Sequence, residues 1–199
     1  MNTLLLLIDP QTDFHDIPST ISEYQPKLPI HGSWQDALRL AAFINAPESN
    51  ITDIFVTLDS HEKVDISHPT YWIDTRTGTH PAPFTQITIE DYNKGLYQVT
   101  NMEKVEHARR YLSYLDSNDK LTHTIFNEHC LVGTEGHGIV APIKHSIDAW
   151  ESRTGKAPTL FNKGENPDYE FFGPFEAQML DSSSPDTFMK IDLILELIS

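Results

Sequence analysis

LLLLID, at residues 4–9, is the stretch that decides the fold class of this chain. Its five apolar residues show no polar alternation, which is typical of a strand buried on both faces in a parallel sheet. Residues 33–44 then repeat apolar side chains with a helical period, and residues 51–58 form a second apolar run. Strand, helix and strand at this spacing predict a right-handed βαβ unit. The chain is therefore expected to be an α/β protein with a mostly parallel sheet.

Each of these two predicted strands is followed by a carboxylate. Asp9 follows the first strand, and Asp59 follows the second, two residues before His61. Open α/β sheets bind ligands at the carboxyl ends of their strands, and a carboxylate beside an imidazole suits Zn²⁺, Fe²⁺ or Mn²⁺. A capping or turn role explains Asp9 equally well from its position alone. Asp-x-His taken alone is more often a polar turn than a metal site.

A third stretch, IFNEHCLVGTEG at residues 125–136, also places reactive side chains after a predicted strand. The strand is expected over residues 122–126, and it leads to His129 and Cys130. The glycines that follow supply the conformations that a tight loop needs. Loops at the ends of buried strands commonly hold ligands in α/β proteins, so this stretch is expected to join the two carboxylates in one site.

The remaining periodic segments complete the predicted order of elements. Helices are predicted over residues 102–115, 139–153 and 187–198, and a short strand is predicted over residues 158–162. Lys163 follows this strand directly. Its position alone favours a solvated surface lysine over a residue of the ligand crevice.

Length, charge and cysteine content limit the classes of function. The 199 residues predict a single domain over residues 1–199, with an insertion at about residues 62–120. The net charge of −15 argues against nucleic acid or an anionic membrane as a partner. One cysteine excludes an internal disulfide and fits a reducing compartment, so a cytoplasmic location is expected. The short first apolar run lacks the basic region of a signal peptide, and no apolar run has membrane-spanning length.

Four motifs then occur in a fixed order. They are LLIDPQTDF at residues 6–14, TLDSH at residues 57–61, FNEHCLVGTEG at residues 126–136 and KG at residues 163–164. With these motifs the chain resembles the isochorismatase-like cysteine hydrolases, and within them the nicotinamidase branch. The resemblance spans residues 3 to about 198. It implies a three-layer αβα sandwich and an amidase that cleaves a small amide, such as nicotinamide, to an acid and ammonia through a thioester.

The resemblance also implies roles for individual residues. Asp9 aligns with the general acid/base of the family and Lys163 with the lysine of its catalytic triad. Phe14 and Phe126 align with the aromatic residues that wall the substrate ring.

The resemblance implies a metal site as well. Asp59, His61 and His129 align with the metal ligands, which distinguish nicotinamidases from the isochorismatase branch. The metal is expected to be Zn²⁺, with Fe²⁺ or Mn²⁺ as alternatives. Compact nicotinamidases often carry a further histidine where this chain has Ser67, and His68 stands one residue later. His68 is therefore a possible site residue.

One departure from the family concerns the nucleophile. In the family, the nucleophilic cysteine lies on a strand-to-helix turn after the last helix predicted here. Cys130, the only cysteine, aligns instead with the residue beside the metal-binding histidine. It is expected to face the core as a structural thiol. The C-terminal part that carries the nucleophile and completes the sheet is therefore expected to be missing.

Three functions stay open on this basis. The first is the amidase just described, active only with the missing C-terminal segment, or an isochorismatase-like hydrolase that acts on another small substrate. The second is a catalytically inactive remnant or binding module that retains the metal site. The third is a metallohydrolase in which the metal activates water and Asp9 acts as the base. A small-molecule amide is the expected partner, and an incomplete sheet with an apolar edge predicts a homo-oligomer.

Overall fold

The computed structural model describes residues 3–187 and shows two compact units. Unit 1 comprises residues 3–60 and 129–163, and unit 2 comprises residues 61–128 and 164–187. The helix predicted over residues 187–198 falls, apart from its first residue, outside the described part of the chain. No helix in the described part is both long and apolar enough to cross a membrane.

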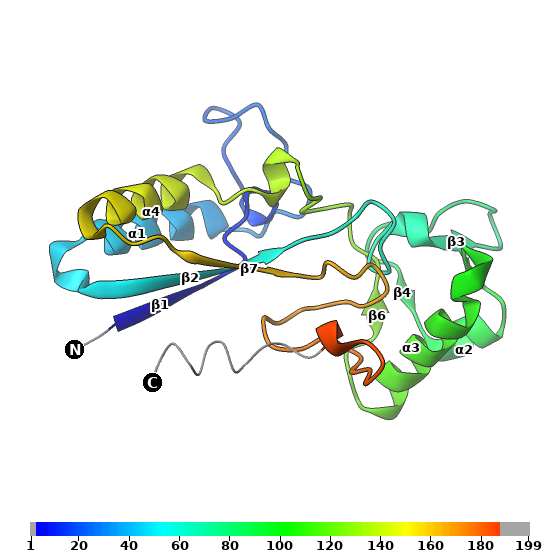
Figure 1. The fold of residues 1–199 in the computed structure, drawn as a ribbon. Coiled ribbons are helices and arrows are strands. Elements are labelled where there is room, and N and C mark those ends of the chain that lie inside the picture. The colour runs from blue at the N-terminus through cyan, green and yellow to red at the C-terminus, as the bar shows by residue number, and fades with distance from the viewer. Residues whose placement is uncertain (1–2, 188–199) are drawn as a thin grey trace. The chain divides into compact units, whose positions relative to one another are not determined.

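Unit 1 contains the parallel sheet that the sequence predicts. Its strands are β1 (Thr3–Ile8), β2 (Ile51–Asp59) and β7 (Thr159–Lys163), hydrogen-bonded in the order β1-β2-β7 (Figure 1). Both pairings are parallel, so all three strands end at the same edge of the sheet. The predicted strands at 51–58 and 158–162 are confirmed, and each extends one residue further to include Asp59 and Lys163, respectively.

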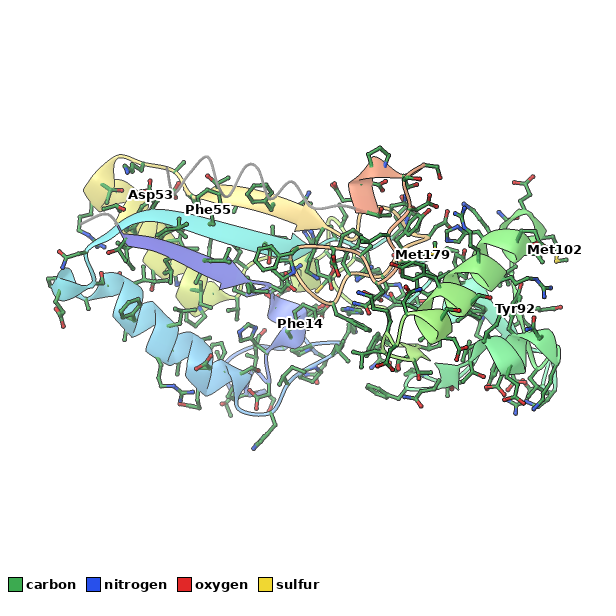
Figure 2. All side chains as sticks on the ribbon, turned by 90° about the horizontal axis from the view of Figure 1, so that it is seen from below. Phe14, Asp53, Phe55, Tyr92, Met102 and Met179 are labelled. Carbon is green, nitrogen blue, oxygen red and sulfur yellow. The ribbon has the colours of Figure 1, made fainter. Side chains whose placement is uncertain are left out.

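Two helices cover one face of this sheet. They are α1 (Ser33–Asn45) and α4 (Ala141–Thr154), which pack against each other on the same side of the strands (Figure 1). The core of unit 1 contains side chains from both the sheet and the helices, among them Leu7, Val56 and Trp150. Most of its side chains are aliphatic. The indole Nε1 of Trp150 donates a hydrogen bond to the carbonyl of Ile51, at 3.1 Å. On β2, Phe55 (labelled in Figure 2) stacks on Phe161 of β7.

Unit 2 is built from shorter elements. Two antiparallel pairs join β3 (Trp72–Asp74) with β5 (Tyr97–Val99), and β4 (Gln86–Ile87) with β6 (His123–Thr124). The helices of this unit are α2 (Ile89–Asn93) and α3 (Val105–Ser117). Its core is rich in aromatic side chains, namely Tyr71, Trp72, Tyr92, Tyr97, Tyr111, Tyr169 and Phe171. Figure 2 labels Tyr92, which lies on α2.

The structure differs most from the prediction at residues 122–126, where one strand is expected. Only His123–Thr124 is a strand, and it pairs antiparallel with β4 of unit 2 instead of joining the parallel sheet. The next backbone amides donate to carbonyls of the same unit: Ile125 to Thr85 and Phe126 to Ser67. A short β-rich run does not reveal its partner strand, and here the nearby loops satisfy its hydrogen bonds.

Single turns of 3-10 helix connect many of these elements. They are Thr12–Phe14, Pro47–Ser49, Pro69–Tyr71, Met102–Lys104, Glu135–His137 and Pro185–Thr187. The helix predicted from residue 102 therefore begins with such a turn and becomes α-helical at Val105.

Candidate active site

Three charged side chains meet where the strands of unit 1 end. The Nζ of Lys163 lies 3.0 Å from Oδ2 of Asp9 and 3.0 Å from Oδ1 of Asp59. The strand register explains the second contact, because Asp59 is paired with Lys163 across β2 and β7. Lys163 is only 6% exposed. The interpretation as a solvated surface lysine, which its position alone favours, is therefore wrong. A buried ammonium needs carboxylates beside it, and this one has two.

Hydrogen bonds hold the side chain of Asp9 and the backbone of Asp59 in place. Asp9 has a left-handed backbone with φ of 48°, and its carboxylate accepts a 2.7 Å hydrogen bond from the hydroxyl of Thr57. The side-chain amide of Gln11 donates to the carbonyl of Asp59 and accepts from its backbone N–H, each at 2.7 Å. The sequence motif contains Thr57 and Gln11, but their supporting roles emerge only from these contacts.

The charges shift the pKa of both Lys163 and Asp9. Burial alone would lower the pKa of Lys163, but Asp59 and Asp9 outweigh it and raise that pKa above its ordinary value. Burial also raises the pKa of Asp9, and Lys163 offsets this only in part. Lys163 therefore remains an ammonium ion at neutral pH, while Asp9 accepts a proton more readily than an ordinary aspartate does.

His129 lies next to Asp59 within unit 1. Its Nε2 is 3.6 Å from Oδ2 of Asp59, on the carboxylate whose other oxygen contacts Lys163. The ring of Phe14 meets the imidazole edge-on, with 5.5 Å between ring centroids. Both His129 and Asp59 are buried. Unit 1 thus brings together five of the predicted site residues, which are Asp9, Phe14, Asp59, His129 and Lys163.

Cys130 has no activated thiol in this structure. Its side chain is fully buried, as expected, and the thiol faces the carbonyl of Gly136 at 3.9 Å. Burial and then the negative charges of Asp59, Asp13 and Asp9 raise the thiol pKa far above its usual range. The expected reason is wrong, however. Cys130 lies in a loop with φ of 49°, not on a strand with alternating faces.

A buried carboxylate holds this loop in place. Asp13 accepts hydrogen bonds from the backbone N–H of Cys130 at 2.7 Å and from the hydroxyl of Tyr24 at 2.7 Å. A Cβ atom on Gly136 would stand 2.1 Å from Oδ2 of Asp13, so any other residue there would displace this carboxylate. Asp13 and Gly136 therefore fix the backbone beside His129.

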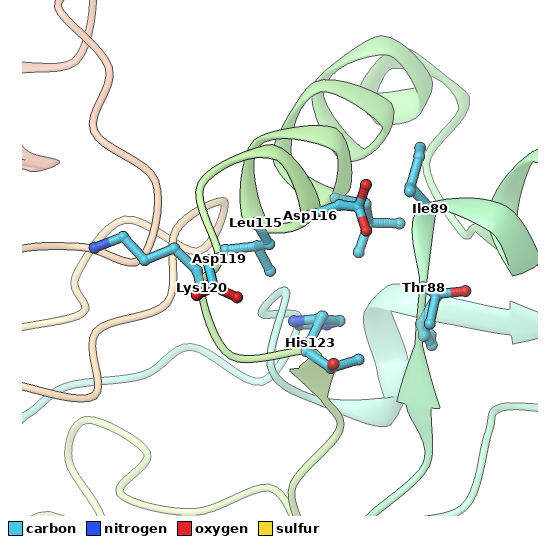
Figure 3. Close-up of a pocket in the computed structure, with 10 residues that line it drawn as sticks. Thr88, Ile89, Leu115, Asp116, Asp119, Lys120 and His123 are labelled. Carbon is cyan, nitrogen blue, oxygen red and sulfur yellow. The ribbon is translucent and has the colours of Figure 1, made fainter.

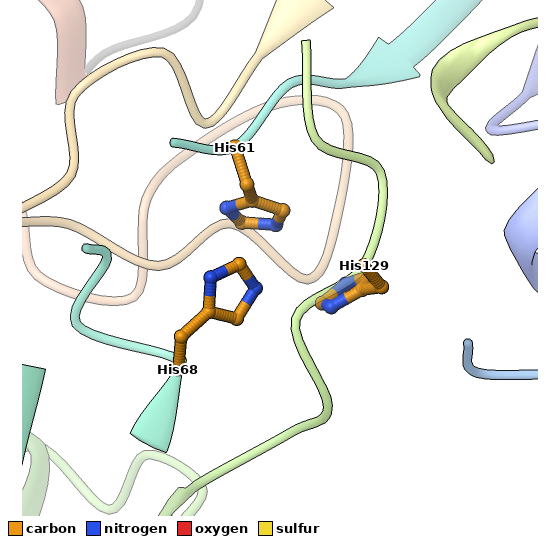
Figure 4. Close-up of side chains that lie close together, drawn as sticks. All are labelled: His61, His68 and His129. Carbon is orange, nitrogen blue, oxygen red and sulfur yellow. The ribbon is translucent and has the colours of Figure 1, made fainter. Parts of the chain in front are cut away.

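Two further histidines lie in unit 2. The ring centroids of His61 and His68 are 5.0 Å apart, and both side chains are buried (Figure 4). The Nδ1 of His61 is 2.9 Å from the carboxylate of Asp65, and the Nδ1 of His68 is 3.1 Å from the carbonyl of Glu62. An acceptor beside Nδ1 favours the tautomer in which Nδ1 carries the proton. Nε2 then has the lone pair, as it does in histidines that bind a metal through this atom. Figure 4 also labels His129, which belongs to unit 1.

Asp65 is a further residue that sequence reasoning missed. Its other oxygen accepts hydrogen bonds from the backbone N–H and the hydroxyl of Ser67, at 2.9 and 2.8 Å. Ser67 thus supports the partner of His61, at the position where nicotinamidases often have a histidine.

Phe126, the last predicted site residue, also lies in unit 2. Its ring packs edge-on against the rings of Phe84 and Phe172.

Comparisons with known proteins give likenesses in structure only. No family model and no curated protein sequence matches the chain. The yeast nicotinamidase Pnc1p bound to the inhibitor nicotinaldehyde matches with a TM-score of 0.60 and 15% identity, over 99% of this chain and 70% of that one. A second structure of Pnc1p matches with a TM-score of 0.61 and 14% identity, over 98% of this chain and 70% of that one. An Acinetobacter nicotinamidase and pyrazinamidase matches with a TM-score of 0.54 and 14% identity, over 98% of this chain and 64% of that one. The chain has the fold of the nicotinamidases.

Proposed function

We propose that the chain is an amidase of nicotinamidase type, with a small planar amide as its substrate. The observation that carries this proposal is the buried ion cluster at the strand ends. A lysine held between two carboxylates is expensive to bury, and proteins retain such groups at sites where they are used. The structural likeness to nicotinamidases supports the same choice.

Asp59, His61 and His129 are the proposed ligands of a divalent metal ion, with Zn²⁺ preferred over Fe²⁺ and Mn²⁺. A carboxylate and two imidazoles form a donor set that suits these ions. The chain keeps Asp59 and His61 two residues apart, and the bond between Asp65 and His61 leaves Nε2 of that ring as the donor atom. When bound, the metal would hold a ring nitrogen or carbonyl oxygen of the substrate by Lewis-acid attraction.

The other proposed roles follow from charge and position. Asp9, with its raised pKa, would take a proton from an attacking water molecule and pass it to the departing ammonia, so that amide and water give acid and ammonia. Lys163 supplies a fixed positive charge beside it, which stabilises negative charge that develops during attack on the amide. Phe14 and Phe126 are proposed to flank the substrate ring.

Water is the proposed nucleophile, because these residues do not supply the thiol that a thioester route needs. Cys130 is buried and its pKa is raised, whereas a nucleophilic cysteine needs a lowered pKa and access to the substrate. We assign Cys130 a structural role. Iodoacetamide is therefore expected to label it slowly in the folded protein and rapidly after denaturation.

The test is ammonia release from nicotinamide with added ZnCl₂. Wild-type protein should release ammonia, and Lys163→Met and Asp9→Asn should each lose at least about a hundredfold in rate. Lys156→Met is the matched control, because Lys156 lies in the same unit but pairs with Asp53 on the surface. Cys130→Ala should keep the wild-type rate. Equal loss in both lysine variants, or loss in Cys130→Ala, would contradict these roles.

The buried thiol also favours a second candidate function, a binding module that holds the amide without cleaving it. Calorimetry with nicotinamide separates the two. Saturable binding that needs Zn²⁺ and occurs without ammonia release would establish the binding module. The absence of both binding and ammonia release would reject both functions.

A further inference from the structure

Among the histidines outside the proposed metal ligands, two have very different surroundings. His123 of unit 2 lines a cavity of about 220 Å³ next to α2 and α3 (Figure 3), but its ring is buried and packs against aromatic side chains. His137 of unit 1 is half-buried on the turn Glu135–His137 and contacts the residue that follows Asp59. His137 is therefore connected to the charged cluster of the candidate active site.

The first connection runs through the imidazole ring. The Nε2 of His137 lies 2.8 Å from the hydroxyl of Ser60, at hydrogen-bond distance. Ser60 is 1% exposed and directly follows Asp59, at the end of β2. Its backbone N–H donates to the carbonyl of Lys163 at 2.8 Å. Ser60 thus joins the ring of His137 to both strands whose ends carry the ion pair between Asp59 and Lys163.

The second connection runs through the backbone of His137. Its carbonyl accepts a 3.0 Å hydrogen bond from the side-chain nitrogen of Gln11. The same nitrogen donates to the carbonyl of Asp59, and the side-chain oxygen of Gln11 accepts from the N–H of Asp59. The two N–H groups of this amide are therefore both used. The turn that carries His137 thus orients the amide of Gln11, and this amide holds the backbone of Asp59.

We infer, on the basis of the proposed amidase function, that His137 is a positioning residue of this site. The bond from its ring to Ser60 holds the turn against the strand end, and the turn presents its carbonyl to Gln11. Both connections keep the carboxylate of Asp59 against the ammonium of Lys163, 3.0 Å away. Residues that support a ligand in this way change activity or metal affinity by about ten- to a hundredfold when they are replaced.

The experiment compares His137→Leu with His137→Gln in the full chain. Leucine makes no hydrogen bond, whereas the amide of glutamine can replace Nε2 of the ring. In the metal-free protein, the ¹⁵N resonance of the Lys163 ammonium reports the contact with Asp59. It should shift in His137→Leu and keep its wild-type position in His137→Gln. The rate of ammonia release from nicotinamide should fall about tenfold in His137→Leu and less than about twofold in His137→Gln.

Two further variants locate the effect. Ser60→Ala removes the other partner of the bond and deletes a single oxygen atom, so it decides the matter if His137→Leu does not fold. It should shift the Lys163 resonance as His137→Leu does, and the double variant should lose no more rate than either single variant, because both remove the same bond. His145→Leu, on the exposed surface of α4 in the same unit, is the control and should leave the resonance and the rate unchanged.

The inference is overturned if the Lys163 resonance stays in place in both His137→Leu and Ser60→Ala, since the strand end would then hold its position without the bond. Equal losses in His137→Gln and His137→Leu would also overturn it. The resonance does not depend on ammonia release. A wild-type protein that releases no ammonia, but whose variants shift the resonance as expected, would reject the amidase and retain the positioning role of His137.

Discussion

The two units differ in the polar groups that they bury. Unit 1 buries charges and pairs them: the ammonium of Lys163 contacts two carboxylates, and Asp13 accepts hydrogen bonds from a hydroxyl and from backbone amides. Unit 2 also buries a carboxylate, that of Asp65, but in addition it buries neutral polar groups among aromatic rings. Its His123 packs against the rings of Trp72 and Tyr111. The Nε2 of His123 and the hydroxyl of Tyr111 have no hydrogen-bond partner in the described part of the chain.

This difference has an energetic meaning. A buried charge is stable only while its partners remain, so each member of the cluster in unit 1 depends on the others. A neutral polar group without a partner costs less free energy to bury than an unpaired charge does. If the pH changes so that the group would become charged, however, the folded state is destabilised. Unit 1 should therefore be sensitive to loss of a partner, and unit 2 to acid.

The largest expected effect is that of Lys163→Met on the free energy of unfolding. Without the ammonium, the carboxylates of Asp9 and Asp59 remain buried without their shared counter-ion, which should cost about 3–5 kcal/mol. Urea unfolding measures this value. Lys156→Met should change it by less than about 1 kcal/mol, because that lysine is on the surface. A similar effect of both substitutions would remove the contrast between the units.

The second prediction concerns acid. His123 has a pKa of about 4 in the folded protein and 6.5 as its ordinary value, so the unfolded chain binds the proton more tightly. This contribution to stability is complete above pH 6.5 and is lost as the pH falls to 4, by roughly 3 kcal/mol in all. Urea unfolding of wild type and His123→Phe across this range should give a shallower pH dependence in the variant. Parallel curves would contradict the assignment.

A smaller effect is expected at Gly136. In Gly136→Ala the new Cβ would stand 2.1 Å from the Asp13 carboxylate, and the rearrangement should destabilise the protein by about 2 kcal/mol. Gly138→Ala is a matched control two residues away. There the nearest atom is the Glu135 carbonyl at 3.4 Å, and φ of −68° suits alanine. Thermal unfolding should separate the two, and equal melting temperatures would show that Asp13 yields easily.

The smallest effect tests local structure in unit 2. The hydroxyl of Thr88 accepts a hydrogen bond from the N–H of Asp91, whose carboxylate accepts from Thr88 in return, at the start of α2. Thr88→Ala should remove about 1 kcal/mol of stability, measured by urea unfolding. The neighbouring Thr85→Ala is the control, since Thr85 is not part of the cap. An unchanged midpoint for Thr88→Ala would mean that tertiary packing alone holds the helix.

The units also differ in how well the sequence predicts them. The strands at 3–8 and 51–58 and the helix at 33–44 are confirmed, because each has a clear period over many residues. Unit 2 uses strands of two or three residues, which are too short to show a period. The prediction of a strand over residues 122–126 in the parallel sheet is therefore wrong.

The candidate site also has a part that the sequence predicts and a part that it does not. The motifs identify Asp9, Asp59 and Lys163, and the structure brings these three together. Position alone made Lys163 a surface residue, since its partners lie more than a hundred positions earlier. The bond from Cys130 to Asp13 spans 117 residues and has no local signature. Supporting contacts of this kind follow from tertiary structure, which the pattern of a single sequence does not contain.

The strand order β1-β2-β7 has a consequence for folding during synthesis on the ribosome. Asp9, directly after β1, and Asp59, at the end of β2, are synthesised early, whereas Lys163 follows about a hundred residues later. At roughly 5–20 residues per second, the two carboxylates wait on the order of ten seconds for their counter-ion. A nascent β1-β2 pair must therefore keep its strand ends hydrated during this time, and closure of the sheet by β7 is the step at which the charged cluster becomes buried.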